Sequence, residues 1–274
     1  MMEPSEELGP FRSGGRMNIN QNLDRLLAVR RPQIHREYRI DFHRQQILDR
    51  RFELHGNFYA GSFEALGPSF EDARLTARQR LFLAGEVLER IALIPLAASP
   101  RAARAGIGEK LRCFVHVEPQ FLLEDAFVER VLETLQQLAP FDLQLVIELA
   151  DEPLDARLAS SPRLARSFFS SAYAISDAGA ELAVCSHRCD NPALQRLLQA
   201  GLCRYVKLDV GAGLTADMQL LTLNDICDQM LAVMHERKVA FIASRVDTPG
   251  DELLARSLPF ALLSGARYSP SERI

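Results

Sequence analysis

The chain has 274 residues, of which 47% are hydrophobic and 25% are charged, and its formal net charge is -4. This length and composition can bury a full core, and they favour one large barrel over two small domains. The acidic balance, with no basic cluster among aromatics, argues against direct nucleic-acid binding. The lack of a long apolar run or signal peptide argues against a membrane role and for a cytoplasmic protein.

Residues 1–37 are predicted to precede the folded domain. The first 16 are rich in Pro, Glu, Ser and Gly without periodicity, which predicts a disordered leader. Leu23, Leu26 and Leu27 then give a brief helical pattern beside Arg30 and Arg31, so we expect a short N-terminal arm. A single domain is expected over residues 38–274.

Strand and helix patterns alternate through that domain. Apolar runs and period-two alternation predict strands at 38–49, 58–66, 111–117, 143–149 and 239–243. Helical spacing of apolar residues predicts helices at 75–94, 97–109, 125–138, 162–178 and 224–235, and Asp125 is an expected N-cap. Such alternation predicts an α/β fold with a parallel sheet.

Residues 181–209 read as strand, loop, helix and strand, which is a βαβ unit. Its two strands would end at Ser186 and Asp209. Functional residues of α/β folds lie at the carboxyl ends of parallel strands, so loop 186–191 and Lys207 with Asp209 are the candidates. The loop offers little that could carry catalysis.

One cluster in this unit contains zinc-type ligands. Cys185, His187, Cys189 and Asp190 lie within six residues. However, Cys-x3-Cys with one His is not a specific ligand pattern, and Cys185 would lie in a packed strand. The chain has five cysteines and is large enough not to need disulfides, so we expect reduced thiols without zinc.

Four motifs occur in an order that resembles the EAL family, barrel domains that hydrolyse the bacterial signalling nucleotide cyclic di-GMP. They are SFEAL at 62–66, VIEL at 146–149, YVKLD at 205–209 and SGARYSP at 264–270. The resemblance covers about residues 38–272 and implies a modified TIM-type (β/α)8 barrel whose last strand lies at 260–270. It also implies that Glu64 and Glu148 stand where the family has metal-ligating glutamates, and that Lys207 and Asp209 form its KxD motif.

The resemblance places eight residues at the family's active-site positions: Glu64, His116, Glu148, Ser186, His187, Lys207, Ser244 and Ser264. Glu64, Glu148 and Lys207 match the family. The other five stand, in chain order, in place of an asparagine, two aspartates, a glutamate and a glutamine. In addition, Gly67 and Pro68 follow SFEAL, where the family has the arginine that holds a substrate phosphate. These positions are therefore interpreted as vestigial.

The substitutions bear directly on chemistry. The family's reaction needs two divalent cations that turn a bridging water into a hydroxide, and too few oxygen donors remain here to hold them. We expect no catalytic residue, no metal or other cofactor and no enzyme activity, with Lys207 pairing with a glutamate in the barrel mouth. The alternative is a single Zn²⁺ or Fe²⁺ on Glu64, His116, Glu148 and His187, which we disfavour against histidines that merely fill a decayed site.

Two hypotheses for function follow from the resemblance. The first is a non-catalytic regulator that binds a protein partner, for example a transcription regulator, in cyclic di-GMP-related control of motility or biofilm genes. The alternative is a cyclic di-GMP receptor without hydrolytic activity. Such receptors in the family retain more of the nucleotide-facing residues, so the missing arginine favours the first hypothesis, with cyclic di-GMP binding weak or absent.

Overall fold

The computed structural model describes residues 38–65, 77–97, 110–150, 161–186, 192–210 and 222–274; at 38–39, 63–65, 96–97, 186 and 192–194 it describes the backbone alone. The predicted leader and arm over 1–37, most of the predicted helix over 97–109, and loop residues 187–191 lie outside the described residues. Within the described ranges, no helix is both long and apolar enough to cross a membrane.

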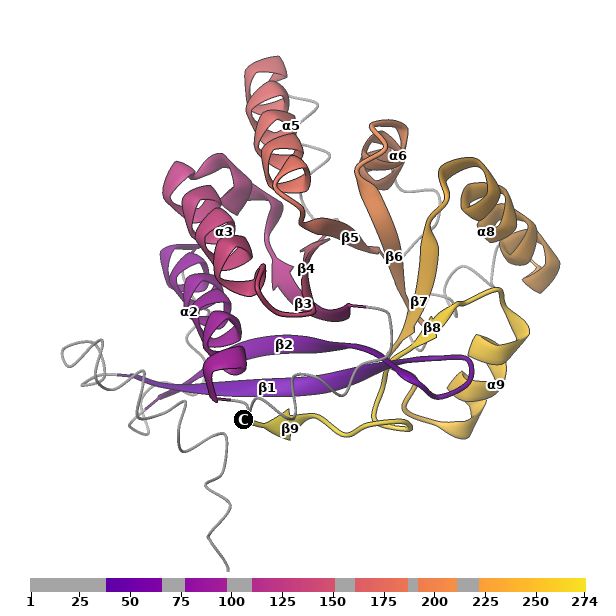
Figure 1. Cartoon of the computed structure of the whole chain (residues 1–274). Helices are drawn as coiled ribbons and strands as arrows, with labels where there is room; N and C mark the ends of the chain where they lie inside the picture. The colour runs from indigo at the N-terminus through magenta and orange to yellow at the C-terminus, as the bar shows by residue number, and fades with distance from the viewer. Residues whose placement is uncertain (1–37, 66–76, 98–109, 151–160, 187–191, 211–221) are drawn as a thin grey trace, which may run out of the picture.

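Eight strands close into a barrel, as the sequence predicts (Figure 1). β3 to β8 follow one another in spatial order and β2 pairs in parallel with β3, while β1 closes the ring by pairing antiparallel with both β2 and β8. A short β9 (Glu272–Arg273) pairs antiparallel with His43 and Arg44 of β1. The barrel strands are β1 (Tyr38–Asp49), β2 (Leu54–Ala65), β3 (Leu111–Val117), β4 (Leu143–Ala150), β5 (Glu181–Ser186), β6 (Cys203–Asp209), β7 (Ala240–Ser244) and β8 (Leu262–Leu263).

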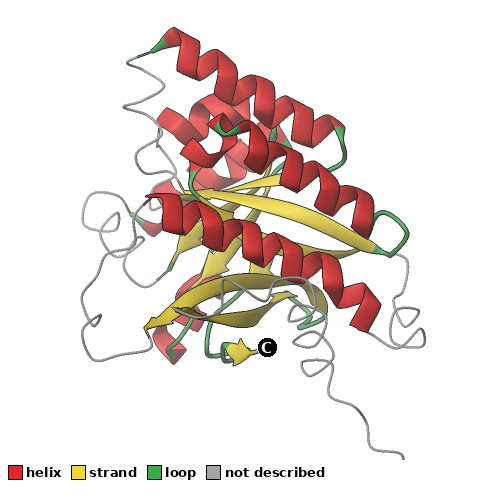
Figure 2. Ribbon diagram, turned by 90° about the vertical axis from the view of Figure 1, so that its left-hand side faces the viewer, coloured by secondary structure: helices red, strands yellow, loops and turns green. Residues whose placement is uncertain are grey.

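Helices lie on the outside of the strands (Figure 2). Their apolar faces cover the outward-facing strand residues in one continuous core. They are α2 (Ala77–Ala97), α3 (Asp125–Leu138), α5 (Pro162–Asp177), α6 (Pro192–Gln199), α8 (Leu223–Arg237) and α9 (Pro249–Ser257), together with the 3-10 helix η2 (Pro119–Leu123). The prediction for α3 has the observed bounds, and those for α5 and α8 differ by no more than two residues at either end.

Inward-facing residues fill the barrel in layers, because side chains alternate across each strand. The middle layer is apolar and consists of Ile47, Phe114, Val146, Ala183, Tyr205, Ile242 and Leu262. On the parallel strands, the residue two positions later faces inward one layer nearer the carboxyl end. That next layer contains four predicted site residues: His116, Glu148, Lys207 and Ser244. It also contains Cys185, which directly precedes the predicted position Ser186. The same alternation places Ser264 at this level after β8.

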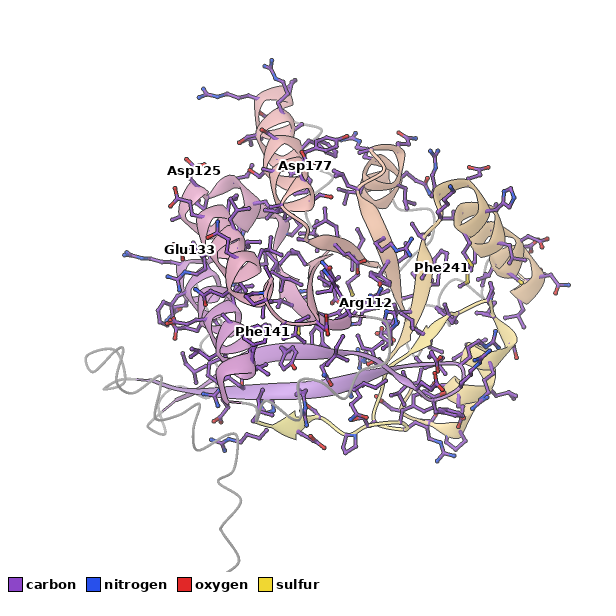
Figure 3. The ribbon with its side chains drawn as sticks, in the orientation of Figure 1. Arg112, Asp125, Glu133, Phe141, Asp177 and Phe241 are labelled. Atoms are coloured by element: carbon purple, nitrogen blue, oxygen red, sulfur yellow. The ribbon has the colours of Figure 1, made fainter. Side chains whose placement is uncertain are left out.

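A polar network closes the other end of the barrel. Arg112 Nε and the Tyr205 hydroxyl both donate to Oε2 of Glu181, at 3.3 and 3.1 Å. Because the Tyr205 hydroxyl donates its hydrogen bond to Glu181, its oxygen accepts one from Nε2–H of His55, at 3.3 Å. Figure 3 shows Arg112 near the centre of the ring of strands. Burial, and then the charge of Arg112, lower the pKa of His55 from 6.5 to about 4, so this imidazole is neutral.

Several predicted boundaries were wrong. β2 begins at Leu54 rather than at residue 58, and α2 runs from Ala77 through Pro95 to Ala97 rather than over 75–94. Glu124, not Asp125, occupies the N-cap position of α3, and Asp125 lies in the first turn, where a carboxylate favours the helix dipole. The last barrel strand covers only Leu262–Leu263 rather than 260–270.

The early end of β8 has a steric cause. Gly265 has φ of +157°, and a Cβ atom there would collide with the backbone of Val246. The amide of Val246 donates to the carbonyl of Ser264 at 3.1 Å, and the amide of Arg267 donates to the carbonyl of Val246 at 3.1 Å. The chain therefore turns against the end of β7 at this glycine, and α9 and β9, which the sequence patterns did not predict, complete the domain around it.

Candidate functional site

Glu148 is the central residue of the barrel mouth. It faces inward from β4 with 1% of its surface exposed. Nζ of Lys207, on β6, donates to both carboxylate oxygens, at 2.9 Å to Oε2 and 3.1 Å to Oε1. Nδ1 of His116, on the adjacent β3, lies 3.1 Å from Oε1. The structure thus confirms the predicted pairing of Lys207 with a glutamate and brings three of the predicted site residues together.

The electrostatics of this cluster keep Glu148 ionised. Burial alone would raise its pKa, but the charge of Lys207 and the hydrogen bond from His116 outweigh burial and lower the pKa from 4.5 to about 2. An ionised carboxylate can only accept hydrogen bonds, so Nδ1 of His116 carries the proton and donates it. The His116 side chain is 44% exposed.

The ammonium group of Lys207 contacts two residues at once. Besides the two oxygens of Glu148, its Nζ lies 4.1 Å from the centre of the Phe58 ring, a cation–π contact. Only 9% of the residue is exposed. A lysine held in this way neutralises the carboxylate and offers little to an incoming anion.

A second ion pair lies at the ends of β6 and β7. Asp209 is buried, and Nη1 of Arg245 donates to its Oδ2 at 3.2 Å, while 72% of the Arg245 side chain remains exposed. Arg245 has φ of +56°, a left-handed conformation that glycine adopts most easily.

Two of the three predicted serine positions, Ser244 and Ser264, form hydrogen bonds within the barrel itself. Ser244 Oγ donates to the carbonyl of Leu208 at 2.9 Å, which ties β7 to β6. Ser264 Oγ donates to Oε1 of Gln45 at 3.3 Å, and Nε2 of Gln45 donates to the carbonyl of Ser269 at 3.1 Å. Both hydroxyls are therefore used within the fold, and neither supplies the negative charge that a metal ligand would.

The remaining predicted positions are located only in part. Glu64 lies on β2 opposite Arg39, and Ser186 ends β5 opposite Leu208, but the side chains of both fall outside the described residues. His187 lies outside them altogether, as do Cys189 and Asp190 of the disfavoured zinc cluster. The contributions of Phe58 and Arg245 were missed from the sequence. Arg245 could have been found, since it directly follows the end of a strand.

The described part of the mouth does not fit a pair of divalent cations. Among the described residues, no three His, Cys, Asp or Glu side chains are grouped as metal ligands. Glu148 already has an ammonium on both oxygens and an imidazole N–H on one, so a cation would have to displace Lys207 to reach it. Ser244 and Ser264, two other inward residues at this level, carry no charge.

Comparison with known proteins identifies the fold of this chain. No family model matches the sequence, and no curated protein matches it. Solved structures do match, among them the Klebsiella pneumoniae BlrP1 protein in a manganese and cyclic di-GMP complex, with a TM-score of 0.61 at 18% identity over 85% of this chain and 56% of that one. The barrel is of the EAL type.

Two further structures agree. The Bacillus subtilis YkuI protein, with an EAL domain in complex with cyclic di-GMP and calcium, gives a TM-score of 0.58 at 13% identity over 85% of this chain and 56% of that one. The EAL domain of Mycobacterium smegmatis DcpA gives 0.56 at 14% identity over 85% of this chain and 93% of that one. The chain thus spans little more than half of BlrP1 and YkuI, but nearly all of the isolated EAL domain.

Proposed function

We propose that this chain is a non-catalytic EAL-type barrel that acts in the cytoplasm by binding a protein partner in cyclic di-GMP-related signalling, for example a transcription regulator of motility or biofilm genes. The observation that carries the proposal is the state of Glu148. Its negative charge is already compensated by Lys207 and its oxygens accept hydrogen bonds from Lys207 and His116.

The contrast with the structural neighbours supports this proposal. BlrP1 binds manganese with cyclic di-GMP, and YkuI binds calcium with it. Hydrolysis of a phosphodiester by metals requires cations that generate hydroxide and neutralise charge on the transferred group. In this chain the cation beside Glu148 is a side chain, which can neutralise the carboxylate but cannot activate water in that way.

Charge balance also argues against tight binding of cyclic di-GMP. The nucleotide carries two phosphates, and each cation described at the mouth already has a carboxylate partner: Lys207 with Glu148, and Arg245 with Asp209. A dianion entering such a mouth meets no net positive charge, and it would have to break an existing pair to gain one. We therefore expect weak or absent binding.

Complementation of a gene deletion tests the proposal. The double variant Glu148→Gln, Lys207→Met removes the central pair while keeping the shape and neutrality of the mouth. If the protein acts through its outer surface, this variant should complement the deletion as well as the wild type does, provided that it is shown to fold. Loss of complementation by the folded double variant would contradict a function outside the mouth.

One observation favours the alternative of a non-hydrolytic cyclic di-GMP receptor. The Arg245 side chain is 72% exposed beside the mouth, and a guanidinium can hold a phosphate through two hydrogen bonds. Isothermal titration calorimetry with cyclic di-GMP separates the two functions. A micromolar or tighter constant for the wild type that weakens at least tenfold in Arg245→Gln would establish the receptor in place of the regulator.

A further inference from the structure

The turn between β1 and β2 holds an aromatic residue in an unusual backbone conformation. The amide of Phe52 donates to the carbonyl of Asp49 at 3.0 Å, and the amide of Asp49 donates to the carbonyl of Glu53 at 2.9 Å. Phe52 has φ of +66°. The left-handed position of such a turn-and-bulge hairpin is ordinarily taken by Gly or Asn, because a bulky residue is strained there. The turn itself therefore does not require an aromatic residue.

Phe52 lies on a surface shared with α9. Its ring centre lies 5.8 Å from that of Tyr268, and the guanidinium of Arg256 lies 4.9 Å above it. Nη2 of Arg50 donates to the carbonyl of Arg256 at 2.9 Å. Figure 1 shows the same arrangement, with the β1–β2 turn beside α9. The hairpin and the helix thus form one continuous face.

This face exposes apolar side chains. Phe52 is 48% exposed, Leu54 is 47% exposed, and Leu253 is 70% exposed one helical turn before Arg256, on the same side of α9. These are three of the six large hydrophobic residues that are exposed in the described part of the chain. Phe52 and Leu253, both next to Arg256, bring exposed apolar side chains together on one face, unlike the single scattered apolar residues of an ordinary surface.

The same face carries arginines that the chain's own carboxylates leave available. Asp49 accepts from the amides of Arg51 and Glu53, and Asp251 accepts from the amides of Asp247 and Thr248. Glu252 binds Arg256 and Arg267. The guanidinium of Arg51 has no partner among the described residues, and that of Arg50 bonds only a carbonyl there. Glu53 is the remaining exposed acid of the turn. We call Arg50, Arg51, Phe52, Leu253 and Arg256 the hairpin face.

We propose that the hairpin face is the docking surface for an acidic segment of a partner protein that also carries an aliphatic or aromatic side chain. Carboxylates of that segment would pair with Arg50 and Arg51, and its apolar side chain would cover Phe52 and Leu253. Aromatic residues and arginines together are the composition of binding hot spots. The inference rests on the proposed function, since it assigns the surface through which a protein-binding barrel meets its partner.

Fluorescence anisotropy with a defined probe tests the docking surface. The probe is a fluorescein-labelled peptide of alternating Glu and Asp with one Leu and one Phe, and its control has Ser in place of Leu and Phe. We expect saturable binding to the wild type and weaker binding of the Ser control. The double variant Arg50→Glu, Arg51→Glu and the single variant Phe52→Asn should each weaken binding about tenfold or more.

A matched charge-reversal variant on another helix tests whether binding depends on the hairpin face or only on the overall charge of the protein. Arg163 and Arg166 are two exposed arginines on α5, and Arg163→Glu, Arg166→Glu should leave the dissociation constant within about twofold of the wild type. Phe52→Asn suits the left-handed turn, so it should fold, as its thermal midpoint will show. Absence of saturable binding to the wild type, or equal weakening by the α5 variant, would overturn the docking surface.

Complementation distinguishes a failure of this inference from a failure of the proposed function. We expect Arg50→Glu, Arg51→Glu to lose complementation of the gene deletion while Glu148→Gln, Lys207→Met retains it. If both variants complement, the docking surface is wrong and the regulatory function stands. If only the mouth variant fails, both the regulatory function and the docking surface are wrong.

Discussion

Lys207 on β6 reaches across β5 to both carboxylate oxygens of Glu148 on β4, at 2.9 and 3.1 Å. The two strands are not neighbours. On β5, which lies between them, the residue opposite Glu148 is Ala183 and the residue opposite Lys207 is Cys185, and both side chains are small. An ion pair buried in this way links two non-adjacent strands, and it leaves the mouth with a compensated carboxylate.

Removal of Lys207 alone should be costly. In Lys207→Met, Glu148 would remain buried with only His116 beside it, and the loss of one partner from a buried ion pair costs about 3–5 kcal/mol in unfolding free energy. The double variant Glu148→Gln, Lys207→Met leaves no uncompensated charge and should lose less than half as much. Urea denaturation measures both. Equal stability of the single and double variants would show that the pair is not coupled.

Acid sensitivity should arise at the opposite end of the barrel. The folded-state pKa of His55 is lowered to about 4, so the unfolded chain takes up a proton at higher pH than the folded one. Unfolding free energy should therefore fall as pH drops from 6.5 toward 4. His55→Gln keeps a donor for Tyr205 but cannot titrate, and its stability should change less over that range. Urea denaturation at a series of pH values measures this dependence. An unfolding free energy that falls equally with pH in the wild type and in His55→Gln would contradict the prediction.

Glu148 acts in a lower pH range. Its pKa is lowered to about 2 in the folded state, so it contributes stability above pH 4.5 that is lost as pH falls from 4.5 toward 2. The variant Glu148→Gln, Lys207→Met should lack this loss while retaining the His55 effect above it. Circular dichroism of acid unfolding in both proteins would reveal the difference, and unchanged curves below pH 4.5 would contradict it.

Two glycines should respond in opposite ways to alanine. A Cβ at Gly265 would collide with the Val246 backbone, so Gly265→Ala should destabilise by about 2 kcal/mol or more. Gly85 lies inside α2, and a Cβ atom added there would have no other atom within 4 Å. Gly85→Ala should therefore raise the unfolding free energy by up to about 1 kcal/mol. Thermal melts of the two variants provide the comparison. A neutral Gly265→Ala would mean that the turn after β8 can relax.

Much of the fold could be predicted because its periodic signals are strong. α3 has a clear apolar stripe and β4 an apolar run, and both appear with nearly the predicted bounds. α9 was not predicted although a start signal exists: Thr248 and Asp251 form a capping box with Pro249 in the first turn. A helix of 9 residues, however, gives only a short apolar pattern. β8 was predicted too long because its end depends on the contact of Gly265 with β7, which no local pattern contains.

Part of the site could also be predicted from the sequence. The pairing of Lys207 with a glutamate followed from the strand-end positions, since the carboxyl ends of parallel strands meet in one mouth. The ion pair of Arg245 with Asp209 was not predicted, although both residues lie at the ends of strands. The contact of Lys207 with Phe58 and the network of His55, Tyr205 and Glu181 were not predicted either, because no local sequence pattern shows which side chains meet inside the barrel.

The most direct test of the non-catalytic mouth is a hydrolysis assay. Purified protein is incubated with cyclic di-GMP and either Mg²⁺ or Mn²⁺, and linear dinucleotide is measured by chromatography beside Glu148→Gln as the control. A carboxylate already compensated by Lys207 predicts no product above the control with either metal. Linear dinucleotide that accumulates with the wild type and disappears with Glu148→Gln would contradict the central claim.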